Sequence, residues 1–325
     1  MVKLKEHLGV VLSQSDQEFD GFGSGFGCVL QEEDMFYLYY TGSIDKNWSK
    51  ASIGIAQSKD GIAFVKYQGN PVISVGKQSV TPTIFKSSGK YWMVFAIRTT
   101  SRLDPRGHGR SLGIATAERP FGPWRFVRQL IEPKEAWEED NIDIGPSAVE
   151  LDNDEHLIFY SNVDSGLLTR VPYGQRWTRR HIGLLRLKIS ASGDIQFSRW
   201  NRNPLAHLNG QLGSWNESLF CPGYLKIGDK HYLLPAASTY SIGYPFKQYI
   251  GIVEDSSPFF ENPSSIAMLI DGPREKHQIL PKARSEIALD SPFPIVRGNE
   301  VWLYYAAMDR ADRIWKTALS IFLIE

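Results

Sequence analysis

A short aromatic and apolar run recurs five times along the chain, and this repeat limits the possible folds more than any other feature. The copies YLYY, WMVF, LIFY, YLLP and WLYY begin at Tyr37, Trp92, Leu157, Tyr232 and Trp302. A proline or glycine stands ten or eleven residues before each copy, at Gly27, Pro82, Pro146, Pro222 and Pro292. Short runs of this kind, bounded by turn-forming residues, are typical of antiparallel strands.

Each aromatic run belongs to a longer unit that also holds a later apolar run containing a small residue. Examples are Gly54 to Ala56 in the first unit and Gly113 to Ala115 in the second. One small sheet cannot bury both of its faces, so neighbouring units must stack and close a ring. Five such units therefore predict an all-β fold, a five-bladed β-propeller whose blades have four antiparallel strands. A β-sandwich with coincidental periodicity is the alternative.

The repeat spans about residues 22–322 of the 325-residue chain, so we interpret residues 1–325 as a single propeller domain. The last run, TALSIFLIE, leaves the fifth unit one strand short. Residues 8–12 (LGVVL) form a candidate strand ahead of the first unit. We expect this N-terminal segment to complete the last blade and so close the ring.

The charge balance argues against several kinds of partner. The 36 basic and 36 acidic residues give a formal net charge of zero, which does not suit a general binder of nucleic acid or membrane surfaces. No apolar stretch approaches the roughly 18 residues of a membrane span, and the N-terminus has no clear signal-peptide cleavage site. Cys28 and Cys221 fall in inner strands of different blades, too far apart for a disulfide. Two free buried thiols favour a cytoplasmic location.

The alternation of strand direction predicts which loops share a face of the propeller. Loops that enter the first strand of a unit and loops that leave its second strand lie at the same end of the axis. Variable loops at one end of a rigid scaffold commonly carry function. Aromatic and hydrogen-bonding side chains on this face suit a sugar, and the substrate-binding candidates are Trp48, Arg98, Asp104, Arg106, His108, Asn162, Tyr240 and Asp290.

The strand pairs CVLQEEDMFYLYYTG and PTIFKSSGKYWMVF, with the phrase IGIAQSKDGIAFVKYQGNPVI, resemble the five-bladed propeller glycoside hydrolases. These include family 43, the fructosidase-like families and the mannoside phosphorylases of family 130. The resemblance covers nearly the whole chain and implies a glycosidase with a carbohydrate substrate. Such enzymes use one carboxylic acid to protonate the leaving oxygen and one carboxylate to activate water or attack directly. In family 43 these acids stand one or two residues before the proline-like position.

This chain departs from the pattern of the family at the catalytic positions. The residues directly before the five proline-like positions are Phe26, Thr81, Gly145, Cys221 and Ser291, none of them acidic. Cys221 therefore marks the possible loss of an acid in the fourth blade.

The nearest acids supply three catalytic candidates, Asp20, Asp143 and Glu217. Asp143 fits the blade-three pattern best, and Asp20 fits a looser pattern of an acid followed by glycines and a strand. Glu217 has the expected blade and residue type, but three extra residues could displace it by roughly 10 Å. Each could instead be a structural loop or cap residue. Carboxylates crowded at one axis would raise one pKa and produce an acid at neutral pH.

The cluster RTTSRLDPRGHGR, residues 98–110, holds four arginines and a histidine on the same face. Such a cluster could bind an anion, either an acidic sugar or inorganic phosphate. Three functions are therefore open: a glycosidase, a glycoside phosphorylase, and a non-catalytic carbohydrate-binding propeller. The sequence has no zinc or nucleotide motif, so we expect no cofactor and no metal.

Overall fold

The computed structural model describes residues 2–15, 19–46, 48–99, 109–139, 141–151, 154–163, 179–239, 248–271, 286–309 and 311–325. Four of the substrate-binding candidates lie outside the described residues: Asp104, Arg106, His108 and Tyr240.

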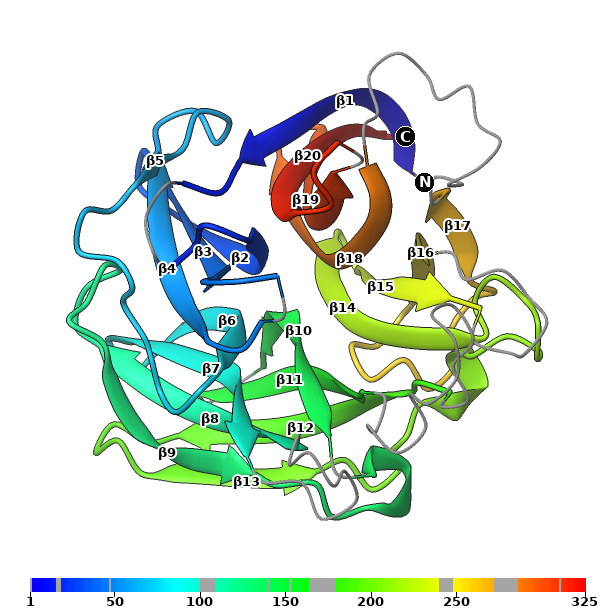
Figure 1. Cartoon of the computed structure of the whole chain (residues 1–325). Coiled ribbons are helices and arrows are strands. Elements are labelled where there is room, and N and C mark those ends of the chain that lie inside the picture. The colour runs from blue at the N-terminus through cyan, green and yellow to red at the C-terminus, as the bar shows by residue number, and fades with distance from the viewer. Residues whose placement is uncertain are drawn as a thin grey trace.

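The chain folds into five four-stranded antiparallel sheets arranged in a ring, which confirms the predicted β-propeller (Figure 1). Blade one contains, from the axis outwards, β2 (Ser24–Glu32), β3 (Met35–Ser43), β4 (Ala51–Ser58) and β5 (Val65–Lys66). Blade two contains β6 (Ser79–Ser87), β7 (Lys90–Thr99), β8 (Gly109–Ala117) and β9 (Arg125–Ile131). Blade three contains β10 (Ile142–Glu150), β11 (Glu155–Asn162), β12 (Ile182–Ile189) and β13 (Ile195–Arg199).

Blade four contains β14 (Ser218–Ile227), β15 (Lys230–Ser238), β16 (Gln248–Asp255) and β17 (Ala267–Ile270). Blade five contains β18 (Glu286–Arg297), β19 (Glu300–Asp309), β20 (Trp315–Ile324) and β1 (Val2–Leu12). Two short 3-10 helices, Ala136–Glu138 and Ala206–Leu208, lie in the connections that follow β9 and β13.

The N-terminal strand closes the ring, because β1 pairs with β20 as the fourth strand of blade five. Val2 lies opposite Ile324, and Leu12 lies opposite Thr317. Figure 1 shows the two chain ends next to each other beside this strand pair. Leu12 is buried and belongs to the cluster of apolar residues that packs blade five against blade one. Closure of this kind joins the two ends of the chain within one blade.

Apolar residues fill the gaps between neighbouring blades, as the stacking argument requires. Leu112 of blade two and Ile158 of blade three belong to one such cluster, and Phe159 and Leu233 to the next around the ring. Similar clusters join blades four and five, five and one, and one and two. The buried faces of the sheets therefore form the core, while the innermost strands surround the axis.

The repeated proline or glycine marks a β-bulge in the innermost strand of every blade. The pairing with the second strand is interrupted between Gly25 and Cys28, Val80 and Thr83, Ile144 and Ala148, Phe220 and Gly223, and Asp290 and Phe293. In four blades the residue just before the proline or glycine has a left-handed φ, which is 53° at Phe26, 51° at Thr81, 42° at Cys221 and 46° at Ser291. Bulges of this kind re-aim side chains and are frequent next to active sites.

Neighbouring bulges contact one another around the axis. A Cβ atom on Gly145 would lie 2.5 Å from the carbonyl oxygen of Pro222, and one on Gly223 would collide with the carbonyl oxygen of Pro292. Glycine is required at both positions because no side chain fits between these backbones. The close approach ties blades three, four and five together at the centre of the ring.

His156 on β11 is a buried titratable residue in the gap between blades two and three. Its ring centroid lies 4.4 Å from that of Phe85. Burial lowers the pKa of His156 below its ordinary value. The folded protein therefore holds the neutral imidazole.

We expect the His156→Phe variant to lose less stability than the wild type on mild acidification. The unfolded chain has the ordinary histidine pKa, so below about pH 6.5 it binds more protons than the folded state and the free energy of unfolding falls. Urea unfolding at about pH 7.5 and about pH 5.5 measures this difference for both proteins. An equal loss in both proteins would show that His156 does not contribute.

Both cysteines are free and buried, Cys28 in blade one and Cys221 in blade four. In the part of the chain that the structure describes, no helix has the length and hydrophobicity needed to cross a bilayer.

Candidate active site

Asp143 and Asp290 occupy the same position in two innermost strands. Asp143 on β10 lies opposite Ser161, and Asp290 on β18 lies opposite Ala306. Ser161 and Ala306 each stand four residues after the start of the repeated aromatic run of their blade. The bulge of blade three holds one more residue than that of blade five, so the two acids stand at different distances from their prolines. Both carboxylates therefore lie beside the bulges that surround the axis.

The Asp143 carboxylate is held by donors from two blades. The Thr81 hydroxyl donates to Oδ1, and the Arg110 guanidinium lies 2.5 Å from Oδ2. The backbone N–H of Ile144 also donates to Oδ1, at 2.9 Å. The cationic Arg110 and the two further donors, Thr81 and Ile144, suit a carboxylate acceptor.

The Asp290 carboxyl group has a different environment. It is 8% exposed, and Oδ1 accepts hydrogen bonds from the backbone N–H and the hydroxyl of Ser291, at 2.6 and 3.1 Å. Burial raises the pKa of Asp290 to about 6, with the charge of Asp143 adding to the rise and that of Arg180 opposing it. Two carboxyl groups at one site, of which Asp290 has a raised pKa, form a candidate acid and base pair.

Cys221 and Arg180 complete the centre of the site. Burial raises the pKa of the Cys221 thiol, and the negative charges of Asp290 and Asp143 raise it further. Cys221 is therefore a neutral thiol beside both carboxyl groups, where the resemblance places an acid. The Arg180 guanidinium lies 4.4 Å from the ring centroid of Phe220, the blade-four residue in register with the two acids.

Asp20 lies elsewhere, in the fully buried interior of blade one. Its carboxylate accepts hydrogen bonds from the hydroxyls of Ser15 and Tyr40 and pairs with Lys66 at 2.5 Å. Lys66 belongs to β5, the outermost strand of the blade. These contacts anchor the chain segment that precedes β2, and the catalytic assignment of Asp20 stays a prediction.

Glu217 precedes β14 and stands three residues before Phe220, the residue in register with Asp143 and Asp290. Its side chain is 2% exposed, and its Oε2 atom accepts the backbone N–H of Gly213 at 2.9 Å. The carboxylate thus takes part in the structure of its own loop. Its catalytic assignment also stays a prediction.

Three of the expected substrate-binding residues besides Asp290 are described, and they have different surroundings. Asn162 is buried, accepts the backbone N–H of His181 at 2.7 Å and donates to the carbonyl of Arg179 at 3.2 Å. Arg98 lies opposite Arg110 in the pairing of β7 with β8. Trp48 lies in the connection between β3 and β4 and is partly exposed. The binding roles of these residues stay predictions.

Thr81, Arg110 and Arg180 are not among the site residues predicted from the sequence. Arg110 belongs to the basic cluster, and the packing of blade two against blade three brings it to Asp143. The contact of Thr81 with the same carboxylate also crosses a blade boundary. Sequence spacing carries no signal for such contacts, because they depend on how two blades pack.

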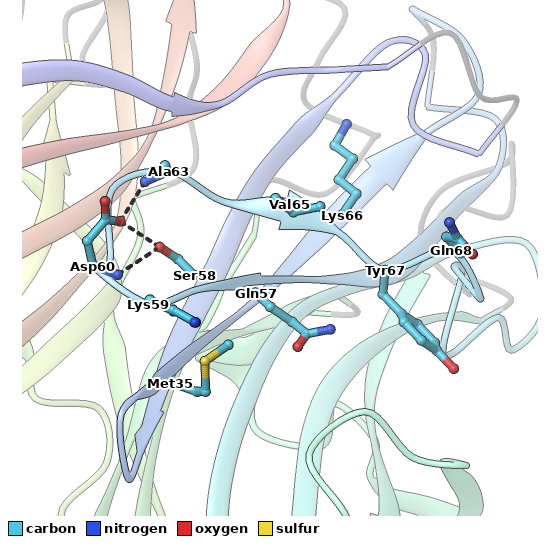
Figure 2. Close-up of a pocket in the computed structure, with 10 residues that line it drawn as sticks. All are labelled: Met35, Gln57, Ser58, Lys59, Asp60, Ala63, Val65, Lys66, Tyr67 and Gln68. Atoms are coloured by element: carbon cyan, nitrogen blue, oxygen red, sulfur yellow. Dashed lines mark hydrogen bonds between the residues drawn. The ribbon is translucent and has the colours of Figure 1, made fainter.

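A separate hollow of about 570 Å³ lies at the outer edge of blade one, between β4 and β5 (Figure 2). Met35, Lys59 and Tyr67 are among its lining residues. Asp60 at one end accepts hydrogen bonds from the Ser58 hydroxyl and the N–H of Ala63, as a turn residue does (Figure 2). The acids at the axis do not line this hollow.

Comparison with known proteins supports the fold. The family model described as the glycosyl hydrolases family 32 N-terminal domain matches residues 5–104. This segment runs from within β1 to beyond the end of β7, and it includes neither Asp143 nor Asp290.

Several solved structures have the same architecture over nearly their whole length. A protein described as a glycoside hydrolase has a TM-score of 0.68 at 14% identity, covering 98% of this chain and 92% of that chain. An arabinanase of Bacillus subtilis has a TM-score of 0.59 at 14% identity, covering 95% of each chain. The α-L-arabinanase of Cellvibrio cellulosa complexed with arabinohexaose has a TM-score of 0.53 at 13% identity, covering 94% and 92%. The expected resemblance to the five-bladed propeller glycoside hydrolases is confirmed.

Proposed function

We propose that this propeller hydrolyses a glycosidic bond, with Asp290 as the acid and Asp143 as the ionised carboxylate. One observation carries the proposal: the two acids share a register position beside the axis, and the pKa of Asp290 is raised to about 6. A carboxyl group with this pKa is partly protonated near neutral pH and can donate a proton. The resemblance to glycoside hydrolases supports the reaction class.

In the proposed reaction the bond between the anomeric carbon and the leaving oxygen breaks. Asp290 gives its proton to the leaving oxygen, so the departing alcohol is neutral. Asp143 either accepts a proton from the attacking water or bonds to the anomeric carbon in a first step. The anomeric configuration of the first product distinguishes these routes, because a single displacement inverts it and a double displacement retains it.

A small oligosaccharide or glycoside is the proposed substrate. An arabinanase with the same fold is complexed with arabinohexaose, which supports a carbohydrate ligand. The basic cluster that suggested phosphate lies mostly outside the described residues, so a phosphorylase stays a prediction. The buried free thiols of Cys28 and Cys221 support the expectation of a reducing, cytoplasmic environment.

Incubation with nitrophenyl glycosides and arabino-oligosaccharides, with and without inorganic phosphate, tests the proposal. We expect free reducing sugar at a rate that does not depend on phosphate. The Asp143→Asn variant should lose activity by a factor of about 10² to 10⁴, the range for removing a general base or acid. Formation of a sugar phosphate that requires added phosphate would indicate the phosphorylase. Sugar binding without turnover would indicate the non-catalytic propeller.

A further inference from the structure

The ring of Phe26 is held between two tryptophans that come from separate segments of the chain. Its centroid lies 4.7 Å from that of Trp315 and 5.5 Å from that of Trp48. Phe26 lies in the bulge of β2, Trp48 in the connection after β3, and Trp315 at the start of β20. All three side chains are partly exposed. They form an aromatic cluster at the end of the propeller where the first strands begin.

A chain of hydrogen bonds joins this cluster to Asp143. The carbonyl oxygen of Phe26 accepts the Thr41 hydroxyl at 3.1 Å, and the Thr41 oxygen accepts the backbone N–H of Thr81 at 2.9 Å. The Thr81 hydroxyl in turn donates to the Asp143 carboxylate. The position of the Phe26 backbone is therefore coupled to the site through two threonines.

Blade five, which carries Asp290, also contacts the strand that carries Phe26. A Cβ atom on Gly25 would lie 3.2 Å from the Cβ atom of Ala306, and Ala306 is the residue opposite Asp290. Trp315 also forms an isolated bridge with Gly23, so blades one and five meet along this edge. Phe26 thus stands between the blade that carries Asp290 and the chain of threonines that leads to Asp143.

Phe26 is a bulky residue at a bulge position where the other blades have smaller side chains. Phe26 has a φ of 53°, a conformation that is unfavourable for a bulky residue. The equivalent bulge residues of blades two, four and five are the smaller Thr81, Cys221 and Ser291. Strain of this kind is retained at sites where the surrounding structure requires it, and such sites are frequently functional.

We infer that Phe26, supported by Trp48 and Trp315, is the surface on which the substrate's sugar ring stacks. The ligand class is a neutral sugar ring with a face of C–H groups, because such a face buries apolar area against an aromatic ring. Its hydroxyl rim would remain free to meet the carboxyl groups. The inference deepens the proposed function and rests on it for the carbohydrate nature of the ligand.

The test measures sugar binding separately from turnover. Arabinohexaose and the methyl glycosides of arabinose, xylose, galactose and glucose are titrated into the Asp290→Asn protein by calorimetry. We expect Phe26→Ala in this background to weaken binding of the preferred sugar by about tenfold, and Phe26→Tyr to preserve it. Saturation-transfer NMR should show the strongest transfer to the C–H protons of one ring face, and weaker transfer in Phe26→Ala.

Two further variants keep the result interpretable. Phe26→Leu keeps an apolar side chain but removes the flat ring, so it should also weaken binding if stacking matters. Phe197→Ala removes an exposed aromatic ring on β13, the outer strand of blade three, and should leave binding unchanged. Equal affinity in Phe26→Ala, Phe26→Leu and the parent protein would overturn the inference, as would failure of the parent to bind any of these sugars. Sugar binding that depends on Phe26 without hydrolysis in the wild type would leave the inference standing and reject the proposed hydrolase.

Discussion

Replacing Asp290 by Asn is expected to lower kcat/KM for glycoside hydrolysis by about 10³-fold, within the range for loss of a general acid. The amide has nearly the shape of the carboxyl group but no proton to give to the leaving oxygen. In the wild type, the pKa of about 6 means that the protonated form declines as the pH rises above that value. The activity of the wild type should therefore fall above about pH 6, and the profile of the variant should lack this limb.

The same substitution is expected to stabilise the fold at neutral pH. The pKa of Asp290 is raised from 3.8 in the unfolded chain to about 6 in the folded protein, so the folded state binds this proton more tightly. The contribution of this proton to the free energy of unfolding is fully present below pH 3.8. It is lost as the pH rises through about 6. At 1.36 kcal/mol per pKa unit the loss approaches about 3 kcal/mol. Urea unfolding should show that Asp290→Asn gains stability over the wild type between pH 5 and about pH 7.5.

Two matched variants separate Asp290 from the other candidate acids. Glu217→Gln should retain most of the activity, since the Glu217 carboxylate supports its own loop. Asp20→Asn should lower stability, because Lys66 would lose its charged partner, while the folded fraction keeps its kcat. If Glu217→Gln abolished hydrolysis and Asp290→Asn did not, Glu217 would be the acid and the present assignment would be wrong.

Removing residues 2–12 is expected to bring the propeller close to global unfolding. These residues form β1, whose loss would leave β20 as an unpaired edge strand and expose the apolar residues around Leu12. At about 1 kcal/mol for each backbone hydrogen bond, losing half a dozen bonds costs roughly 6 kcal/mol. That amount equals the whole stability of a marginal protein. Thermal unfolding and the soluble yield of the truncated chain measure the effect.

A circular permutant provides the control for this truncation. Val2 lies opposite Ile324, so a two-residue Asn-Gly turn placed directly after Ile324 could lead into residues 2–12. The permuted chain would begin at residue 13 and restore the same strand pair as a hairpin. It should recover most of the melting temperature. A truncated chain as stable as the wild type would contradict the closing role of β1.

The repeated glycine and prolines show how far a local pattern can predict structure. Their constant distance from the aromatic runs identified five equivalent strands. Their conformational role, a bulge with a left-handed residue such as Thr81 or Cys221, became visible only in the strand pairing. A bulge is a property of two strands, so the residues of one strand do not reveal it.

The acids of the site show more clearly what residue spacing in the sequence fails to predict. Counted back from the prolines, Asp143 and Asp290 stand at unequal distances. In the strand pairing, however, each lies opposite the equivalent residue of the second strand of its blade. The same counting selected Asp20, whose carboxylate pairs with Lys66 inside blade one. A single extra residue in the bulge of blade three was enough to hide the shared register of Asp143 and Asp290.

By itself, the sequence determined the five-fold repeat, the antiparallel strands and the face on which the variable loops gather. These follow from the alternation of apolar and turn-forming residues, which acts over a few neighbouring positions. Only the tertiary structure decided that Asp143 meets Thr81 and Arg110, that Asp290 is buried with a raised pKa, and that the ring of Phe26 contacts two tryptophans. Each of these depends on the packing of one blade against another, where contacts join residues distant in sequence and burial sets the cost of charge.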